Sequence, residues 1–294
     1  MEICVALGGG GFRGLAHVGA LQVLEEEGYE IVALAGTSIG GIVAAMYAAG
    51  STPQELVTLF DQSSQLGLLR SRPEQGGLIG FDKIETHLAS LLGDVRFDEL
   101  QIPLALTATN LETGHEFVVT EGVVIEAVMA SMAVPGIFPP RLFRGERLVD
   151  GGAMDPVPVA PVRSLADAPV VAVVLTPSPD EWGANHSSPY PLLAAFPVLD
   201  RFSQLRPGQA LMVFLRTMEI SSRMFTELRL QVDQPEVIVR PDVSHVGAFD
   251  QPDAGEMAAL GAKAMKNVLP ALESYFKPGR RWRRRLWRLF KGDG

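Results

Sequence analysis

The chain has 294 residues, of which 47% are hydrophobic and only 20% are charged, so it is long enough to bury a large core. This composition excludes a disordered, collagen-like or coiled-coil protein, and the single cysteine, Cys4, excludes a disulfide scaffold or a cysteine-rich metal site. The net charge of −9 argues against nucleic-acid binding by the body of the protein.

The chain is predicted to alternate strands and helices. We expect strands at residues 3–7, 31–35, 102–109, 116–120 and 170–175, and helices at residues 14–27, 40–49, 53 to about 65, 81–92, 123–132 and 254–276. The strands are apolar throughout rather than alternating, which is typical of a sheet covered on both faces. The pattern predicts an α/β fold with three layers, α/β/α, and a mostly parallel central sheet. We expect one domain over residues 1–276 and a separate tail at 277–294.

Residues 31–54 contain no charged side chain and are long enough to span a bilayer. Four glycines interrupt them, so a buried strand, a tight turn and a buried helix explain the segment better than a transmembrane helix. The chain starts without the basic region of a secretory signal, and we expect a cytoplasmic protein. Residues 176–207 are rich in proline and are predicted to form either a surface loop or a lid over a site.

A glycine-rich run, Gly8-Gly9-Gly10-Gly11-Phe12-Arg13-Gly14, joins the first predicted strand to the first helix. Its spacing matches a dinucleotide-binding fingerprint, but the second strand ends without the carboxylate that would hold a ribose. A phosphate-binding P-loop is excluded because no Gly-Lys-Ser/Thr follows. Several backbone N–H groups can converge in such a run, which predicts a site for a phosphate or for a developing oxyanion.

The segment Gly36-Thr37-Ser38-Ile39-Gly40 is a Gly-x-Ser-x-Gly sequence between a predicted strand and a predicted helix. That is the context of a nucleophile elbow, in which glycines permit a cramped turn that exposes the serine hydroxyl. The alternative is a structural turn with a serine that caps the helix. Because an anion-binding glycine run precedes it, we favour Ser38 as a nucleophile.

Two kinds of base for Ser38 are compatible with the sequence. A hydrolase triad would use a later histidine, His186 or His245, but neither lies in a recognisable signature, and His17 fits a buried histidine of the first helix. The segment Asp150-Gly151-Gly152 follows a short apolar strand and is positioned to face a cleft, although Asp-Gly is also a common turn.

The glycine run ending in Arg13-Gly14, the Ser38 pentapeptide and Asp150-Gly151-Gly152 together resemble the three signatures of the patatin-like phospholipases. They stand in the order and at separations that this family shows, and residues 239–250 are similar to its bacterial branch related to neuropathy target esterase. The resemblance covers about residues 3–270. It implies a patatin-like three-layer fold and a serine acyl hydrolase with a Ser–Asp dyad and no catalytic histidine.

By this resemblance Ser38 is the nucleophile and Asp150 its general base. The backbone N–H groups of three residues would form the oxyanion hole: Gly9, Gly10 and Gly11. Further residues support the motifs: Arg13, Gly14, Gly36, Gly40, Gly151 and Gly152. Arg13 either braces the glycine run or meets a substrate phosphate. The implied mechanism needs no metal or cofactor, and the implied substrate is a phospholipid or lysophospholipid.

Two other functions remain open. The chain could be a soluble carboxylesterase or thioesterase that acts on small acyl substrates, or a catalytically silent lipid- or nucleotide-binding regulator. Because the sequence retains Ser38, Asp150 and the glycine run together, the silent protein is the weaker alternative.

The tail at residues 277–294 carries eight basic side chains and one acidic one, a net charge of +7, whereas residues 1–276 sum to −16. On a helix its large apolar side chains would share one face: Trp282, Leu286, Trp287, Leu289 and Phe290. A basic helix with such a face is typical of interfacial membrane binding. We expect contact with an anionic membrane surface on its inner, cytoplasmic side. Docking onto the protein's own surface and nucleic-acid binding are the alternatives, and we do not expect nucleic acid.

Overall fold

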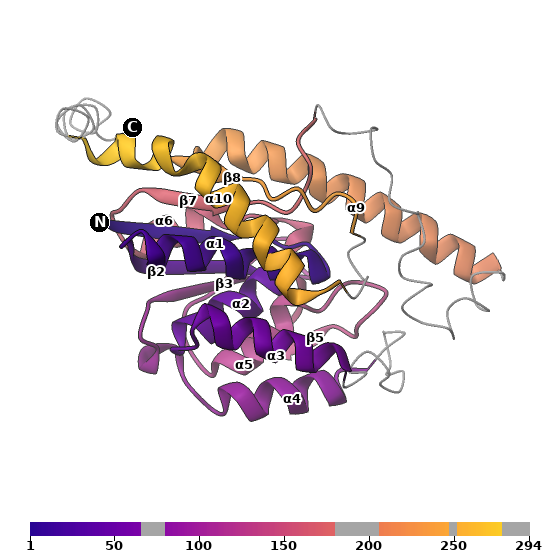
Figure 1. The fold of residues 1–294 in the computed structure, drawn as a ribbon. Coiled ribbons are helices and arrows are strands. Elements are labelled where there is room, and N and C mark those ends of the chain that lie inside the picture. Colours follow the sequence, from indigo (N-terminus) through magenta and orange to yellow (C-terminus); the bar gives the residue numbers. More distant parts are fainter. Residues whose placement is uncertain (66–79, 180–205, 247–251, 278–294) are drawn as a thin grey trace, which may run out of the picture.

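The computed structural model describes residues 1–65, 80–179, 206–246 and 252–277 (Figure 1). A mixed sheet of eight strands lies at the centre, in the order β5-β6-β3-β2-β1-β7-β8, with β4 paired to β3. The strands are β1 (Glu2–Leu7), β2 (Glu30–Thr37), β3 (Leu104–Asn110), β4 (Glu116–Val119), β5 (Arg141–Phe143), β6 (Glu146–Asp150), β7 (Val170–Val173) and β8 (Val237–Val239). Strands β1, β2, β3, β7 and β8 are parallel, and β4, β5 and β6 are antiparallel additions at the β3 end. The predicted α/β fold is confirmed.

The helices cover the two faces of the sheet unequally. They are α1 (Leu15–Glu26), α2 (Ile39–Ala48), α3 (Pro53–Gln65), α4 (Asp82–Leu92), α5 (Val124–Ser131), α6 (Val159–Leu165), α9 (Arg206–Asp233) and α10 (Ala254–Phe276). Three short 3-10 helices accompany them: η1 (Gly11–Gly14), η2 (Phe97–Glu99) and η3 (Gly151–Ala153). Helices α1 to α5 and α10 share the larger hydrophobic core, whereas α6 and α9 cover the opposite face.

The side chains of the central strands are larger on the face with more helices than on the face that α6 covers. In β1, Val5 and Leu7 face the larger core, and Cys4 and Ala6 face the α6 side. Strand β2 repeats the pattern, with Leu34 toward the larger core and alanines toward α6. Small residues on one face let α6 approach the sheet closely, and its Val159 and Val162 are buried against them.

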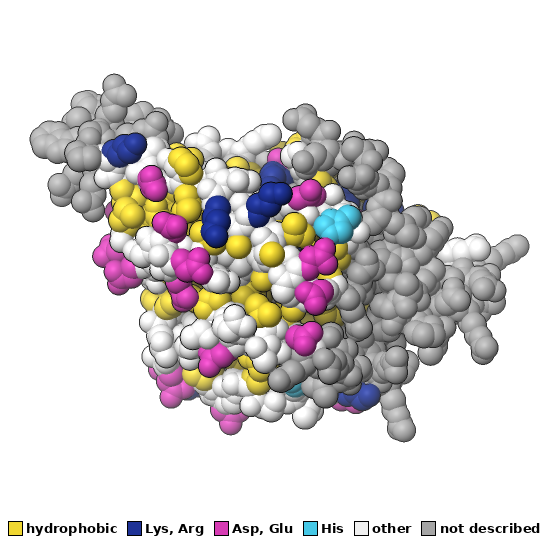
Figure 2. Space-filling model, in the orientation of Figure 1, with side chains coloured by type: hydrophobic (Ala, Val, Ile, Leu, Met, Phe, Trp, Pro, Cys, Tyr) yellow, Lys and Arg dark blue, Asp and Glu magenta, His cyan; other side chains and the backbone are white. Residues whose placement is uncertain are grey.

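Helices α1 and α10 cross in direct backbone contact. A Cβ atom on Gly19 would lie 1.7 Å from the Ala258 carbonyl oxygen, and one on Gly261 would lie 1.8 Å from the Ala16 carbonyl oxygen. Both positions therefore require glycine. Figure 2 shows acidic side chains spread over the face that α10, α1 and α3 form, in keeping with the acidic charge of residues 1–276.

The uncharged segment at residues 31–54 forms most of β2, then α2 and the start of α3. Across the described ranges, no helix is long and apolar enough to cross a membrane. Helix α10 runs through Pro270, and its bounds match the prediction. Four elements were not predicted: α6, α9, β5 and β8.

Candidate active site

The glycine-rich run and Ser38 lie side by side because they follow neighbouring parallel strands. Leu7 at the end of β1 pairs with Gly36 near the end of β2. Both strands end at the same edge of the sheet, where β1 continues into η1 and β2 continues into α2. A Cβ atom on Gly9 would lie 3.6 Å from Cβ of Ser38, so the loop borders this serine.

Ser38 occupies a strained turn between β2 and α2. Its φ of 56° and ψ of −123° fall in a region that costs a non-glycine residue about 1–3 kcal/mol. Its backbone N–H donates to Oγ of the buried Ser131 over 2.9 Å. Gly40 permits the turn, because a Cβ there would lie 2.2 Å from the Leu7 carbonyl oxygen. These are the features of a nucleophile elbow.

Asp150 ends β6, and its carboxylate faces Ser38. Its backbone N–H donates to the Ala133 carbonyl oxygen over 2.9 Å, and its Oδ1 accepts the Gly152 N–H over 2.7 Å. The side chain is only 7% exposed, and this burial raises its pKa from 3.8 to about 6. Hydrogen bonds from Ser38 and Gly152 oppose the rise in pKa by favouring the charged form. At neutral pH Asp150 is therefore a carboxylate that can accept a proton from the serine hydroxyl.

The first two N–H groups of the glycine run are already bonded within the protein. Gly8 donates to the Val173 carbonyl oxygen over 3.0 Å, and Gly9 donates to the Pro156 carbonyl oxygen over 2.9 Å. The N–H of Gly9 is thus occupied, which differs from the expectation that it would donate to an oxyanion. The N–H groups of Gly10 and Gly11 make no hydrogen bond to the part of the chain that the structure describes.

His17 contacts the glycine run from α1. It is fully buried, and its Nε2 lies 2.7 Å from the Gly8 carbonyl oxygen. Burial lowers the pKa of His17 to about 4, so the ring is neutral and Nε2–H donates to that oxygen. His17 is therefore the buried histidine that the sequence suggested, and it holds the glycine run. No described histidine hydrogen-bonds Ser38, and His186 lies outside the described residues.

Arg13 is buried beside the same run. Its Nε donates to the Val246 carbonyl oxygen over 2.5 Å, a contact that fits the bracing role rather than requiring a phosphate. Three further motif glycines make close contacts, in which an added Cβ would lie within 2.6 Å of neighbouring atoms: Gly14 at Ile39, Gly36 at Gly40 and Gly41, and Gly151 at Thr107.

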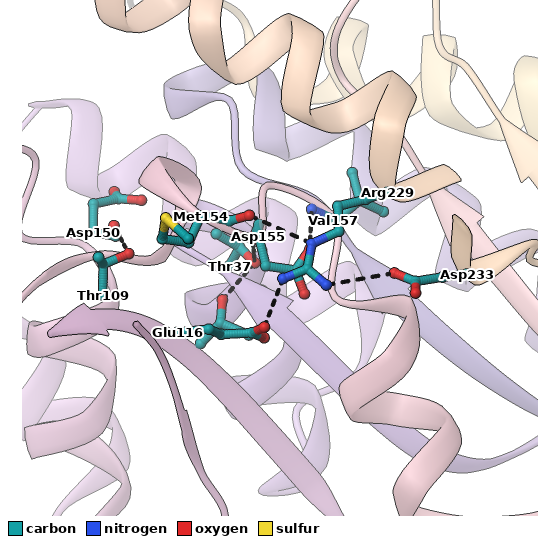
Figure 3. A network of polar contacts seen from close by, with 10 residues as sticks. Thr37, Thr109, Glu116, Asp150, Met154, Asp155, Val157, Arg229 and Asp233 are labelled. Carbon is teal, nitrogen blue, oxygen red and sulfur yellow. Dashed lines mark hydrogen bonds and ion pairs between the residues drawn. The ribbon is translucent and has the colours of Figure 1, made fainter. Parts of the chain in front are cut away.

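A buried polar network lies behind the site (Figure 3). Oγ1 of Thr37 donates to the Asp155 carbonyl oxygen over 2.9 Å. Arg229 of α9 joins three acidic residues, with 2.6 Å to Glu116, 3.8 Å to Asp155 and 4.0 Å to Asp233. Burial and the nearby Glu116 raise the pKa of Asp155. The network ties α9 to the residues that follow η3 and hence to the loop of Asp150.

The contacts of several of these residues were not predicted from sequence, although Ser131 and Asp155 lie in stretches that resemble the family. Ser131, Glu116, Asp155 and Arg229 come from different elements, and none stands in a local pattern that signals its partner. Their roles depend on which elements the fold brings together. Among the described residues, no group of three or more His, Cys, Asp or Glu side chains is placed to hold a metal ion.

Two predictions fall outside the described residues. One is the tail with its apolar face, Trp282, Leu286, Trp287, Leu289 and Phe290, and the other is most of the loop at residues 176–207. Both remain predictions.

The family follows from comparison with known proteins. A family model for patatin-like phospholipases matches residues 5–163, which is more than half of the chain. The chain belongs to the patatin-like phospholipase family. The three signatures that carry the resemblance in the sequence include Ser38 and Asp150, and this patatin-like chain brings those two residues together.

Curated relatives share this patatin-like region. The chain is 35% identical over 179 residues to an uncharacterized NTE family protein of Mycobacterium tuberculosis. This alignment covers 60% of this chain and 50% of the relative. It is 33% identical over 197 residues to lysophospholipase NTE1 of Cryptococcus neoformans, covering 63% of this chain and 12% of that protein. The chain thus spans about half the length of the mycobacterial relatives. The crystal structure of VipD from Legionella pneumophila aligns with a TM-score of 0.49 and 13% identity, over 92% of this chain and 66% of VipD.

Proposed function

We propose that this protein is a serine acyl hydrolase that cleaves acyl esters of phospholipids or lysophospholipids. The observation that carries the proposal is the strained Ser38 turn, hydrogen-bonded to the buried carboxylate of Asp150, in a patatin-like chain. The relatives named lysophospholipase support the lipid class of the substrate.

In the proposed first step, Oγ of Ser38 attacks the ester carbonyl carbon while its proton passes to Asp150. The carbon–oxygen bond to the alcohol then breaks, and the departing oxygen takes that proton. An acyl-enzyme remains. Water attacks it, gives a proton to Asp150 and releases the fatty acid, and Ser38 recovers its hydrogen. A carboxylate is a weak base for a hydroxyl, so proton transfer from Ser38 depends on the hydrogen bond between the two side chains and on the burial of Asp150.

Charge on the carbonyl oxygen must be stabilised during both attacks. The N–H groups of Gly10 and Gly11 are suited to that role, because they are unbonded in the described structure and lie at the start of η1. We assign the oxyanion hole to these two donors, with Gly9 contributing only if its bond to Pro156 opens. Loss of one such donor typically slows a reaction by about 100-fold or more.

We further propose that the enzyme works as a peripheral protein on the inner face of a membrane. A bilayer holds the proposed substrate, and the basic tail at residues 277–294 would add attraction to anionic lipid, about 1 kcal/mol for each basic side chain near the surface.

The direct test is fatty-acid release from lysophosphatidylcholine and phosphatidylcholine by the full chain. Wild type should release fatty acid, and Ser38→Ala should lower the rate by at least 1,000-fold, on the order of what loss of a nucleophile costs. Ser90→Ala is the matched control, because that serine lies on α4 and bonds only its own helix at the His87 carbonyl oxygen. Activity confined to short soluble esters would favour a carboxylesterase, and activity that survives Ser38→Ala would overturn the proposal.

A further inference from the structure

Helix α9 carries an unusual share of the exposed apolar surface. Thirteen large hydrophobic side chains are exposed among the described residues, and seven of them lie on α9. They include Val213 at 67% exposed and Val232 at 75% exposed. We call these seven the α9 outer face: Val213, Phe214, Ile220, Met224, Phe225, Leu228 and Val232.

The α9 outer face is a continuous stripe. Val213, Ile220, Met224 and Leu228 are separated by seven, four and four residues, which places them in one row along a helix. Phe214, Phe225 and Val232 form the adjacent row at spacings of eleven and seven. The stripe spans 20 residues, or about 30 Å of helix.

The charged side chains described on α9 flank this stripe, and each of them is paired within the protein. Glu219 bonds Arg216 and Arg223 over 2.6 and 2.7 Å, and Glu227 bonds Arg240 over 2.6 Å. The described positions of α9 that are exposed carry no charge at all. A helix on the surface of a water-soluble protein has the opposite arrangement, with apolar residues inward and charges outward. An apolar stripe of this size marks a surface that something covers.

Helix α9 lies beside the candidate active site. A Cβ atom on Gly136 would lie 3.0 Å from Leu211 and 3.6 Å from Phe214, so this part of α9 contacts the segment after α5. Glu219 lies close enough to Arg13 for its pKa to be lowered by that charge. Arg229 reaches the Met154 carbonyl oxygen just beyond η3. Helix α9 therefore runs beside the glycine-rich run and the loop that follows Asp150, and one end of it projects past the body (Figure 1).

We propose that the α9 outer face is a lipid-bilayer contact surface, which places the Ser38 site against the membrane that holds its substrate. The proposal rests on the proposed lipid hydrolase function. A bilayer fits better than a protein partner, because a projecting ridge needs no complementary groove to enter a fluid interface. Protein interfaces also surround their apolar core with a polar rim, whereas among the described side chains of α9 the exposed polar ones are Gln209, Thr217 and Gln231.

The experiment is sedimentation of the full chain with vesicles of pure phosphatidylcholine, which carry no net charge and so remove the electrostatic attraction of the basic tail. Ile220→Gln/Leu228→Gln should lower the vesicle partition coefficient by about tenfold or more. Leu111→Gln/Leu142→Gln is the matched control, since both leucines are exposed and neither belongs to α9. It should bind as wild type does.

Two further readouts separate the possible failures. Hydrolysis of p-nitrophenyl butyrate, a soluble ester, should be the same in wild type and in the α9 variant, which shows an intact fold and site. Vesicle binding should also persist in Ser38→Ala, so it can be judged even if no lipid is hydrolysed. Equal vesicle binding by all variants would overturn the proposal. So would sedimentation velocity that shows a wild-type dimer and a monomeric α9 variant, because the face would then join two copies.

Discussion

Burial sets how Asp150 titrates, and this makes its role measurable through pH. The carboxyl is nearly inaccessible to solvent and its pKa is raised to about 6. The proposed mechanism needs the carboxylate, so kcat/KM on a soluble ester should rise about tenfold per pH unit below pH 6 and level off above it. The measurement is a pH–rate profile from pH 4.5 to 8.5, with circular dichroism at each pH to show that the protein stays folded. A profile that is flat between pH 5 and 8 would contradict the assignment.

The raised pKa of Asp150 also predicts that the stability contribution of this carboxyl falls with rising pH, whereas the activity rises. A carboxyl whose pKa is higher in the folded state favours folding fully below the unfolded value near 3.8, and this contribution is lost as the pH rises through about 6. At pH 7 the buried charge therefore costs the protein up to about 3 kcal/mol. Asp150→Asn keeps an oxygen for the Gly152 N–H and removes the charge.

We therefore expect Asp150→Asn to lose hydrolysis while raising the thermal unfolding midpoint at pH 7.5, and to match wild type at pH 4. Calorimetry at the two pH values checks this. A variant that is less stable than wild type at pH 7.5 would show that the carboxylate stabilises the fold instead.

Ser38, Asp150 and the glycine run could be predicted from sequence because each stands in a short local pattern between a strand and a helix. The hydrogen-bond partners of these residues could not be predicted. Ser131, which accepts the Ser38 N–H, is 93 residues away, and the Pro156 oxygen that occupies the Gly9 N–H belongs to a loop after η3. Hydrogen bonds between distant segments leave no periodic signal in the sequence, so the donors available to an oxyanion emerge only from the fold.

Among the elements, α9 and α6 were missed for physical reasons. Helix α9 exposes a row of large apolar residues, so the positions of its apolar side chains do not indicate which face meets the sheet. Helix α6 begins beside Pro158 and contains Pro161, and prolines so close together do not signal a helix. The parallel strands β1, β2, β3 and β7 were predictable because both of their faces are largely buried, and their sequences are therefore mostly apolar.

Arg229 links α9 to the rest of the protein through its contacts with Glu116 and Asp155. Replacing it by methionine would leave Glu116, Asp155 and Asp233 close together without its positive charge. We expect Arg229→Met to lower the free energy of unfolding by about 3 kcal/mol. The loss should grow with pH. At low pH the Asp155 carboxyl stays protonated and does not repel its acidic neighbours, whereas at high pH it is charged.

Denaturant unfolding at pH 6 and pH 8 measures this effect. Arg147→Met is the control, since its pair with Glu112 is more than half exposed on both sides and should contribute less than about 1 kcal/mol. Equal losses for the two variants would mean that the buried network does not hold α9.

At the scale of the whole molecule, the charge is divided between an acidic body of −16 and a tail of +7. The negative charge of the body is repelled by an anionic bilayer. The basic tail and the uncharged α9 outer face would therefore supply the two attractions that bring the enzyme to lipid. Deleting residues 279–294 should therefore weaken binding to anionic vesicles and remove most of its salt dependence. Binding to neutral vesicles should remain.

Sedimentation with phosphatidylserine-containing vesicles at 0.05 and 0.5 M salt makes this comparison. The Ile220→Gln/Leu228→Gln variant should show the complementary loss on neutral vesicles. Undiminished binding to anionic vesicles after the deletion would remove the tail from membrane attachment.

The central claim is that Ser38 is an activated nucleophile served by Asp150, and covalent labelling tests it most directly. Intact-mass analysis after treatment with a fluorophosphonate should show one adduct on wild type, mapped to Ser38. The adduct should be absent from Ser38→Ala and severely slowed in Asp150→Asn. An adduct that persists in Ser38→Ala, or labelling of Asp150→Asn at the wild-type rate, would contradict the account.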